Sequence, residues 1–219
     1  MTSSHKPLTF GDVDVSVVVT NPPWYENCYV LRHRPTDQVV VVDPGGEGPR
    51  LIAHLRAMGG TVAGILLTHG HFDHLGAVAD LQDAFGLTCQ AHQDERPVIE
   101  RAGPLAAMMT GHSIDGPRSC DYFADEPVLE IGGLSLRVLH TPGHTPGGVC
   151  FLGDGFVLTG DTLFDHGVGR TDLPGGDGRK LTTSITRLLA DLDENAVLFA
   201  GHGPSWTVGE ARTWWRMMV

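Results

Sequence analysis

Four apolar runs in this chain each end in histidine or aspartate, and this repeated ending strongly limits the possible folds. The runs read ILLTHGHFDH, LRVLHTPGH, FVLTGD and VLFAGH. Runs of this kind are typical of strands buried along their length. Since each buried strand delivers its last residues to the edge of a sheet, we expect the polar ends to meet. They supply seven candidate site residues: His69, His71, Asp73, His74, His144, Asp161 and His202.

Histidines and carboxylates gathered in this way predict a metal site. Neutral imidazoles and carboxylates are ligands of Zn²⁺, and iron and manganese accept them too. Burying so many of these groups together without a cation would be costly. We therefore expect two divalent metal ions, with zinc the first choice and iron or manganese the alternatives. The other histidines, including His5, His92 and His140, lack this setting and are expected to be ordinary surface or core residues.

The hydrophobic pattern predicts one α/β domain over residues 1–219, because no low-complexity linker divides the chain. Residues 93–126 show no sustained period, so an irregular connection with one short helix is expected there, or a lid over a pocket. The closing tryptophan-rich segment could be a core-covering helix or a dimer contact, and the oligomeric state stays open. Strands are expected at 14–20, 27–32, 38–43, 62–69, 87–92, 134–141, 147–153, 155–161 and 196–202, and helices at 49–58, 75–86 and 180–192.

Composition excludes some classes of partner. The chain has 15 basic and 26 acidic residues, and its formal charge of −11 disfavours nucleic acid. Its start lacks the basic and apolar pattern of a signal peptide, and no run reaches the roughly 20 apolar residues of a membrane span. Four widely spaced cysteines suit reduced, mostly buried thiols. We expect a cytoplasmic protein that acts on a small molecule and contacts no membrane.

The motifs THGHFDH, HTPGHTPG, LTGDTLF and FAGHGP together resemble those of the metallo-β-lactamase-fold hydrolases. NCYVLR, VVDPGG, GVGRTDLPGGD and the late GHGP look most like short bacterial type II glyoxalase-like enzymes, which hydrolyse hydroxyacylglutathione thioesters. The resemblance implies an αββα sandwich, in which two mixed β-sheets are flanked by helices. It also implies a metal site along one edge of the sandwich.

The resemblance further implies a role for each candidate residue. His69, His71 and His144 would hold one metal, Asp73, His74 and His202 the second, and Asp161 would bridge the two. A metal-bridging hydroxide would attack a thioester such as S-lactoylglutathione, with Asp73 and Asp161 as the catalytic carboxylates. Asp43, at the end of its strand, is a candidate to orient a ligand histidine, although it could equally cap the turn that follows.

The sequence constrains the substrate less than it constrains the metal ligands. Arg170 stands where the glutathione-thioester hydrolases place a lysine that binds the peptide carboxylate, but it could instead pair with Asp172 or Asp177. The longer glyoxalases also have a His-Glu-Tyr at the last metal strand, where this chain has Gly203 and Pro204 after the histidine. We expect no helical C-terminal glutathione-binding domain, because only residues 203–219 follow His202. The substrate could therefore be another thioester, possibly glutathione-linked.

Other activities of the fold remain in competition. A persulfide dioxygenase, with one iron held by two histidines and an aspartate, has a Gly-Arg-Thr-Asp like the one at 169–172. Here LPGGD follows that motif and both ligand sets are complete, which favours hydrolysis. A lactonase stays possible. A β-lactamase is disfavoured, since the common subclasses have cysteine at the position of Asp161 and are exported. A domain that only binds metal is disfavoured by the complete ligand set.

Overall fold

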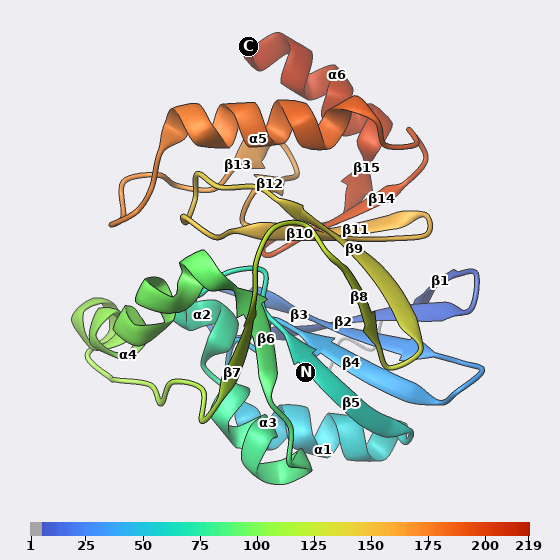
Figure 1. Cartoon of the computed structure of the whole chain (residues 1–219), viewed down its shortest axis with the longest axis vertical. Coiled ribbons are helices and arrows are strands. Elements are labelled where there is room, and N and C mark those ends of the chain that lie inside the picture. The colour runs from blue at the N-terminus through green and yellow to red at the C-terminus, as the bar shows by residue number, and fades with distance from the viewer. Residues whose placement is uncertain (1–5) are drawn as a thin grey trace.

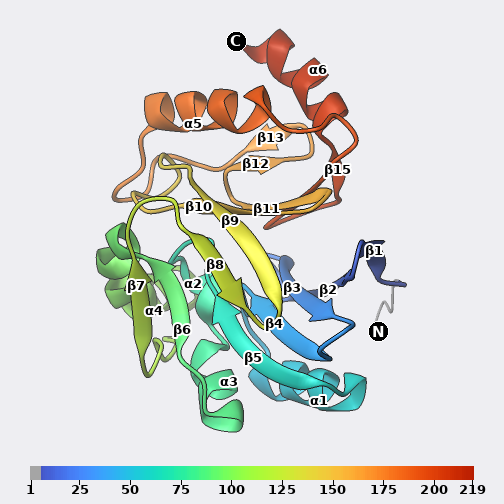
Figure 2. The ribbon, with the colours of Figure 1, turned by 45° about the vertical axis from the view of Figure 1, so that its right-hand side comes forward.

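Two β-sheets lie face to face in the middle of the molecule, and helices cover both outer faces (Figure 1). The computed structural model describes residues 6–219, so the expectations for His5 and the first residues lie outside this range. The first half of the chain builds one sheet and the second half builds the other (Figure 2). The architecture is the expected αββα sandwich, with mixed strand directions in both sheets.

The first sheet has the strand order β1-β2-β3-β4-β5-β6-β7. Its first four strands pair antiparallel, and β4 to β7 pair parallel. The run Val39–Val42 in β4 is fully buried, and alternate valines enter the cores on opposite sides of the sheet. This explains its unbroken apolar sequence. The strands are β1 (Leu8–Phe10), β2 (Val13–Thr20), β3 (Glu26–His33), β4 (Gln38–Val42), β5 (Thr61–Leu66), β6 (Cys89–His92) and β7 (Cys120–Phe123).

The second sheet has the order β15-β14-β11-β10-β9-β8, and all its pairs are antiparallel except β11 with β14. A small hairpin, β12 with β13, lies in the loop that follows β11. Phe151, Phe156 and Phe199 from this sheet pack against valines of the first sheet. The strands are β8 (Val128–Ile131), β9 (Leu134–His140), β10 (Val149–Gly153), β11 (Phe156–Gly160), β12 (Leu163–Phe164), β13 (Gly167–Val168), β14 (Val197–Ala200) and β15 (Trp206–Thr207).

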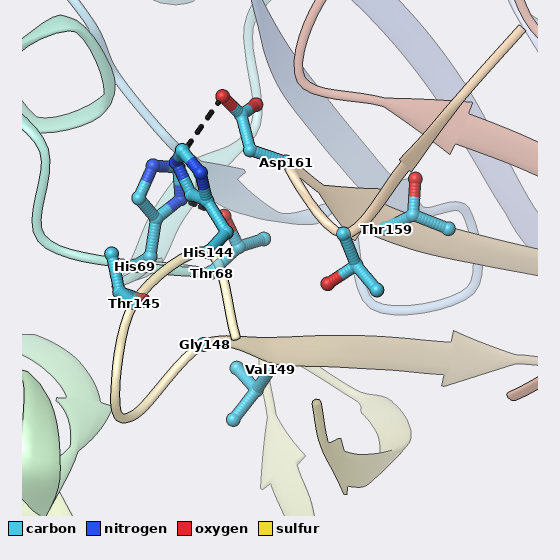
Figure 3. A pocket seen from close by; sticks show the side chains of 9 residues that line it. Thr68, His69, His144, Thr145, Gly148, Val149, Thr159 and Asp161 are labelled. Carbon is cyan, nitrogen blue, oxygen red and sulfur yellow. Dashed lines mark hydrogen bonds and ion pairs between the residues drawn. The ribbon is translucent and has the colours of Figure 1, made fainter. Parts of the chain in front are cut away.

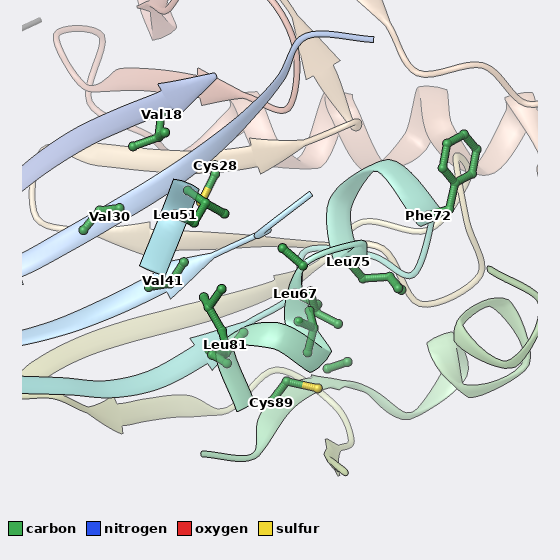
Figure 4. Packing of buried hydrophobic residues seen from close by; sticks show 14 of the residues in the cluster. Val18, Cys28, Val30, Val41, Leu51, Leu67, Phe72, Leu75, Leu81 and Cys89 are labelled. Atoms are coloured by element: carbon green, nitrogen blue, oxygen red, sulfur yellow. The ribbon is translucent and has the colours of Figure 1, made fainter. Parts of the chain in front are cut away.

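Each outer face is closed by an apolar layer between sheet and helices. Figure 4 shows Leu51 and Leu81, from α1 and α3, packed toward the first sheet. Trp215 of α6 is buried against the second sheet, so the closing segment is a core-covering helix. Of the two possibilities left open for that segment, the structure shows this one. The helices are α1 (Gly48–Met58), α2 (Phe72–Leu75), α3 (Val78–Phe85), α4 (Arg96–Thr110), α5 (Gly178–Ala190) and α6 (Val208–Met218).

One expectation for the helices needs a shifted start, and one was wrong. The helix expected at 75–86 forms as α3 but begins at Val78, after the separate short helix α2 has ended at Leu75 and the chain has turned at Gly76, where a β-carbon would clash with a backbone oxygen of Gly45. Residues 93–126 hold the 15-residue helix α4 and the edge strand β7, not one short helix in an irregular connection. The buried face of α4 consists of Ile99, Ala102 and Ala106. Alanine makes a weak hydrophobic signal, so the helical period is hard to see in the sequence.

The cysteines behave as expected. Cys28, Cys89 and Cys150 are buried, Cys120 is half-buried, and all four are free thiols. Within residues 6–219, no helix combines the length and apolar character needed to cross a membrane.

Candidate metal centre

The structure brings all seven candidate residues to one edge of the sandwich. His69 and His71 follow β5, and Asp73 and His74 lie in the short helix α2. From the second sheet, His144, Asp161 and His202 lie just beyond β9, β11 and β14. The carboxylate of Asp161 faces the neighbouring rings of His69 and His144 (Figure 3). The strand ends therefore meet as the apolar runs predicted.

A first group consists of His69, His71 and His144, whose ring centroids are 4.6–4.9 Å apart. All three side chains are buried, and each can offer a nitrogen within 4.8 Å of the others. Burial, with the neighbouring imidazoles, lowers the pKa of His69 well below its usual value. Burial and the nearby His144 lower the pKa of His71 to about 3. The lowered pKa values of His69 and His71 favour the neutral imidazole, which is the form that binds metal.

A second group consists of Asp73, His74 and His202, and its ligand atoms also lie within 4.8 Å of one another. Nε2 of His202 is 3.4 Å from Oδ2 of Asp73. Burial opposes protonation of His74, but the carboxylates of Asp161 and Asp43 outweigh it and raise the pKa of His74 well above its usual value. Carboxylates therefore surround the histidines of the second group, whereas the histidines of the first group lie mainly beside one another.

Asp161 lies between the two groups. Its Oδ1 is 3.3 Å from Nε2 of His74, and its Oδ2 is 3.5 Å from Nε2 of His144 and 3.6 Å from Nε2 of His202. Burial alone would raise the pKa of Asp161, but His74 and the other two histidines hold it well below its usual value. One ionised carboxylate thus faces both groups, as a bridging ligand must.

The unsatisfied atoms of this site fit a cation. Nε2 of His69, Nε2 of His74 and Oδ1 of Asp161 are buried and make no hydrogen bond within the described chain. Buried polar atoms without partners are rare and call for an explanation. All three belong to the residues that the sequence predicts as ligands. Their lone pairs are the donors that a divalent ion such as Zn²⁺ takes from histidine and carboxylate.

Backbone carbonyls orient two of the histidines. Nδ1 of His144 is 2.7 Å from the backbone oxygen of Arg170, and Nδ1 of His202 is 3.0 Å from that of Trp24. A carbonyl can only accept, so each Nδ1 carries the proton and donates it. In the neutral ring this puts the lone pair on Nε2, the nitrogen that would bind a metal, which is a common way to fix the tautomer of a ligand histidine.

Asp43 plays the same part for His74. Its Oδ2 lies 3.0 Å from Nδ1 of His74, and its Oδ1 accepts the backbone N–H of Thr68 at 2.7 Å. The side chain is buried at the end of β4, between the two parallel strand ends. The structure thus places Asp43 against a predicted ligand, the orienting position considered from the sequence.

The side chain of Arg170 lies at the surface, outside the buried groups. Its side chain is 52% exposed, and Nε and one terminal nitrogen each bond Asp172 at 2.7 Å. Asp177 instead caps α5 by accepting the backbone N–H of Arg179 and of Lys180. The surface ion pair considered from the sequence is therefore formed with Asp172, while the backbone of Arg170 touches His144.

Two buried carboxyl groups near the centre were not found from the sequence. Glu26 accepts a hydrogen bond from Thr20, and burial raises its pKa well above the usual value, although His74 opposes this. Glu95 contacts the backbone of two ligand loops. In the sequence, nothing distinguishes either residue from a surface glutamate.

A further cluster of possible ligands, His92, Asp94 and His140, does not suit a metal. The rings of His92 and His140 are stacked, with centroids 4.3 Å apart and planes inclined by 16°. A metal must lie near the plane of each ring that binds it, and two parallel planes cannot share one ion in this way. These histidines have the ordinary structural role that the sequence predicts.

Comparisons with known proteins identify the family to which this chain belongs. Residues 21–202 match the family model of the metallo-beta-lactamase superfamily. The hydroxyacylglutathione hydrolase GloC of Haemophilus influenzae is 36% identical over 78% of this chain and 83% of its own length. The structure of TTHA1623 in a di-iron-bound form is 40% identical, with a TM-score of 0.79, and the match covers 91% of this chain and 98% of that one.

A third match is the B3 metallo-beta-lactamase BLEG-1. It is 36% identical, its TM-score is 0.85, and the match covers 91% of this chain and 96% of that chain. The family model spans all seven candidate residues, from His69 to His202. This chain belongs to the metallo-beta-lactamase superfamily of metal-dependent hydrolases.

Proposed function

We propose that this protein is a metal-dependent hydrolase that cleaves a thioester such as S-lactoylglutathione. The observation that carries the proposal is the position of Asp161, whose carboxylate faces two complete ligand groups at once. His69, His71 and His144 would hold one divalent ion, and Asp73, His74 and His202 the other. The donors suit zinc, and iron or manganese are the alternatives.

Bound there, two such ions would supply a water of lowered pKa and a Lewis acid for the substrate carbonyl. The residues of the chain set up this chemistry. Asp161 stays ionised between the groups, and Asp73 places a second carboxylate beside His202. The carbonyls of Arg170 and Trp24 keep Nε2 of His144 and His202 unprotonated in the neutral rings. Arg170, on the surface beside the centre, would bind a carboxylate of the thiol portion of the substrate.

The similarity to GloC supports a glutathione thioester as the substrate. The similarity to BLEG-1 at 36% identity favours β-lactam hydrolysis as a second candidate, because the same attacking group opens an amide ring. The persulfide dioxygenase and lactonase activities considered from the sequence remain testable with the same protein.

The test combines metal analysis of the purified protein with three assays: hydrolysis of S-lactoylglutathione, hydrolysis of a chromogenic β-lactam, and oxygen uptake with glutathione persulfide. We expect about two metal ions per chain and thioester hydrolysis without oxygen uptake. Asp161→Ala should abolish hydrolysis while circular dichroism shows a retained fold. Asp165→Ala, at a half-buried carboxylate four residues away that pairs with His166, is the matched control. One iron per chain with oxygen uptake and no thioesterase activity would overturn the proposal.

A further inference from the structure

Glu95 is a fully buried carboxyl group that joins two separate ligand loops. Its Oε2 accepts the backbone N–H of Gly70 at 2.6 Å, and its Oε1 accepts that of Gly147 at 2.7 Å. Gly70 stands between His69 and His71, and Gly147 follows His144 in the loop before β10. One side chain, located just before α4, therefore holds the two loops that carry the first group.

Both loops approach Glu95 too closely for a side chain at either glycine. A β-carbon at Gly147 would lie 2.7 Å from the backbone nitrogen of Glu95 and 3.0 Å from its Cγ. One at Gly70 would lie 3.0 Å from Oε2 of Glu95 and 2.7 Å from Cγ1 of Ile99. These glycines are explained by close approach to Glu95, and each leaves its N–H pointing at the carboxylate.

The burial of Glu95 is not explained by an ion pair. Across residues 6–219, no Lys, Arg or His side chain forms a salt bridge with it. Burial raises its pKa to about 7, while the hydrogen bonds from the two loops oppose that rise. A buried carboxyl without a charged partner is destabilising unless its hydrogen bonds compensate. Here the main compensation comes from the loops that carry the ligands.

The second group is oriented by other residues. Asp43 contacts His74, and the carbonyl of Trp24 contacts His202. Among the described residues, Glu95 makes no hydrogen bond with Asp43, Trp24 or Asp161. The two groups are thus supported by separate sets of hydrogen bonds.

We propose that Glu95 is a positioning residue for the first metal group, fixing the distance from His69 and His71 to His144 through the N–H groups of Gly70 and Gly147. The inference rests on the proposed metal centre. It assigns Glu95 an effect on one metal site and not on the other. Residues that orient metal ligands typically contribute about 10- to 100-fold in metal affinity.

Glu95→Gln is the sharpest test, because the amide keeps the shape of the side chain but replaces one acceptor with an NH₂ group. That NH₂ would face a backbone N–H of Gly70 or Gly147, donor against donor. Glu95→Asp keeps the carboxylate and should recover part of the lost affinity. Glu210→Gln is the matched control, since Glu210 also accepts a backbone N–H, from Thr207 at the start of α6, and in the part of the chain that the structure describes makes no hydrogen bond to either ligand group.

The measurement is zinc binding to the metal-free protein, in competition with a chromophoric chelator. Each Glu95 variant is made in the wild-type chain and in two backgrounds that leave one group intact. His202→Ala leaves the first group, and His71→Ala leaves the second. We expect Glu95→Gln to weaken binding about 10- to 100-fold in the His202→Ala background and less than about threefold in the His71→Ala background.

The possible results separate the role of Glu95 from the existence of the metal centre. Equal losses in both backgrounds, or no loss in either, would overturn the role of Glu95 while leaving the metal centre in place. Failure of the wild-type chain to bind zinc, iron or manganese would overturn the centre itself, and the inference with it. If Glu95→Gln does not fold by circular dichroism, the same comparison is made with Glu95→Asp, whose unchanged affinity in the His202→Ala background would refute the inference.

Discussion

Oδ2 of Asp43 lies 3.0 Å from Nδ1 of His74, and the two residues are 31 positions apart in the chain. The contact joins the ends of β4 and the segment after β5, which run parallel and side by side. The same carboxylate accepts the hydroxyl of Thr68 at 2.5 Å. Asp43 therefore orients the ring of His74, a predicted ligand, and also holds the strand end from which the loop of residues 69–74 departs.

Asp43→Asn should weaken the second metal group selectively. The amide replaces one oxygen with an NH₂ donor, so either His74 or Thr68 loses its acceptor. We expect zinc affinity of the second group to fall about 10- to 100-fold. Unfolding by urea should show a loss of about 1–3 kcal/mol, because a buried donor is left unsatisfied. Asp37→Asn, at an exposed carboxylate paired with Arg32 in the same half of the chain, should change neither quantity appreciably.

Metal binding should release protons mainly from the second group. Burial opposes protonation of His202, but Asp73 and Asp161 outweigh it and raise its pKa, as carboxylates do for His74. By contrast, His69 and His71 have lowered pKa values and carry no proton to release. Titration calorimetry in buffers of different ionisation enthalpy should therefore show proton release with His71→Ala and almost none with His202→Ala. The reverse order would contradict the assignment.

The same shifts set the sign of a pH effect on stability. A histidine whose pKa is raised in the folded protein makes its full contribution to the stability of the metal-free protein at pH values below 6.5, its pKa in the unfolded chain. That contribution is lost as pH rises from 6.5 through the raised folded pKa. We expect the urea midpoint of the metal-free protein to fall over this window by less in His202→Ala than in the wild type.

Arg170→Ala should raise KM for S-lactoylglutathione by about tenfold and leave kcat nearly unchanged, since the guanidinium would bind the substrate outside the reacting centre. Asp172→Asn removes the competing partner and should lower KM. Arg118→Ala, at an exposed arginine paired with Asp83, is the matched control. An unchanged KM in Arg170→Ala would show that this arginine forms only its surface pair with Asp172.

Trp215→Ala should destabilise the fold by about 3 kcal/mol in urea unfolding, as large buried aromatic residues do when truncated. The indole is buried against α5, and its N–H donates to Thr186 at 3.1 Å. Metal content should not change, because this layer lies on the outer face of the second sheet. Trp214→Ala, on the more exposed side of α6, should cost distinctly less.

The sequence predicts the centre better than its surroundings, for a physical reason. His69, His144, Asp161 and His202 each end an apolar run, so their convergence follows from strand burial alone. Glu95 lies in residues 93–126, where the buried face of α4 uses alanines and leaves no clear period. Its burial depends on loops that only tertiary structure brings together. The pair formed by Arg170 and Asp172 likewise depends on side-chain placement in an exposed loop.

The seven proposed ligands come from both sheets, four from residues 69–74 and three from residues beyond β9. Ions bound there would cross-link the two halves of the chain. No disulfide does so, because all four cysteines are free thiols. The free energy of unfolding would then rise with the supply of metal, by about 2.7 kcal/mol for one ion at a hundredfold excess over its dissociation constant. In metal-starved cells the protein would lose the stabilisation that bound metal supplies. Its abundance, as well as its activity, would then follow metal availability.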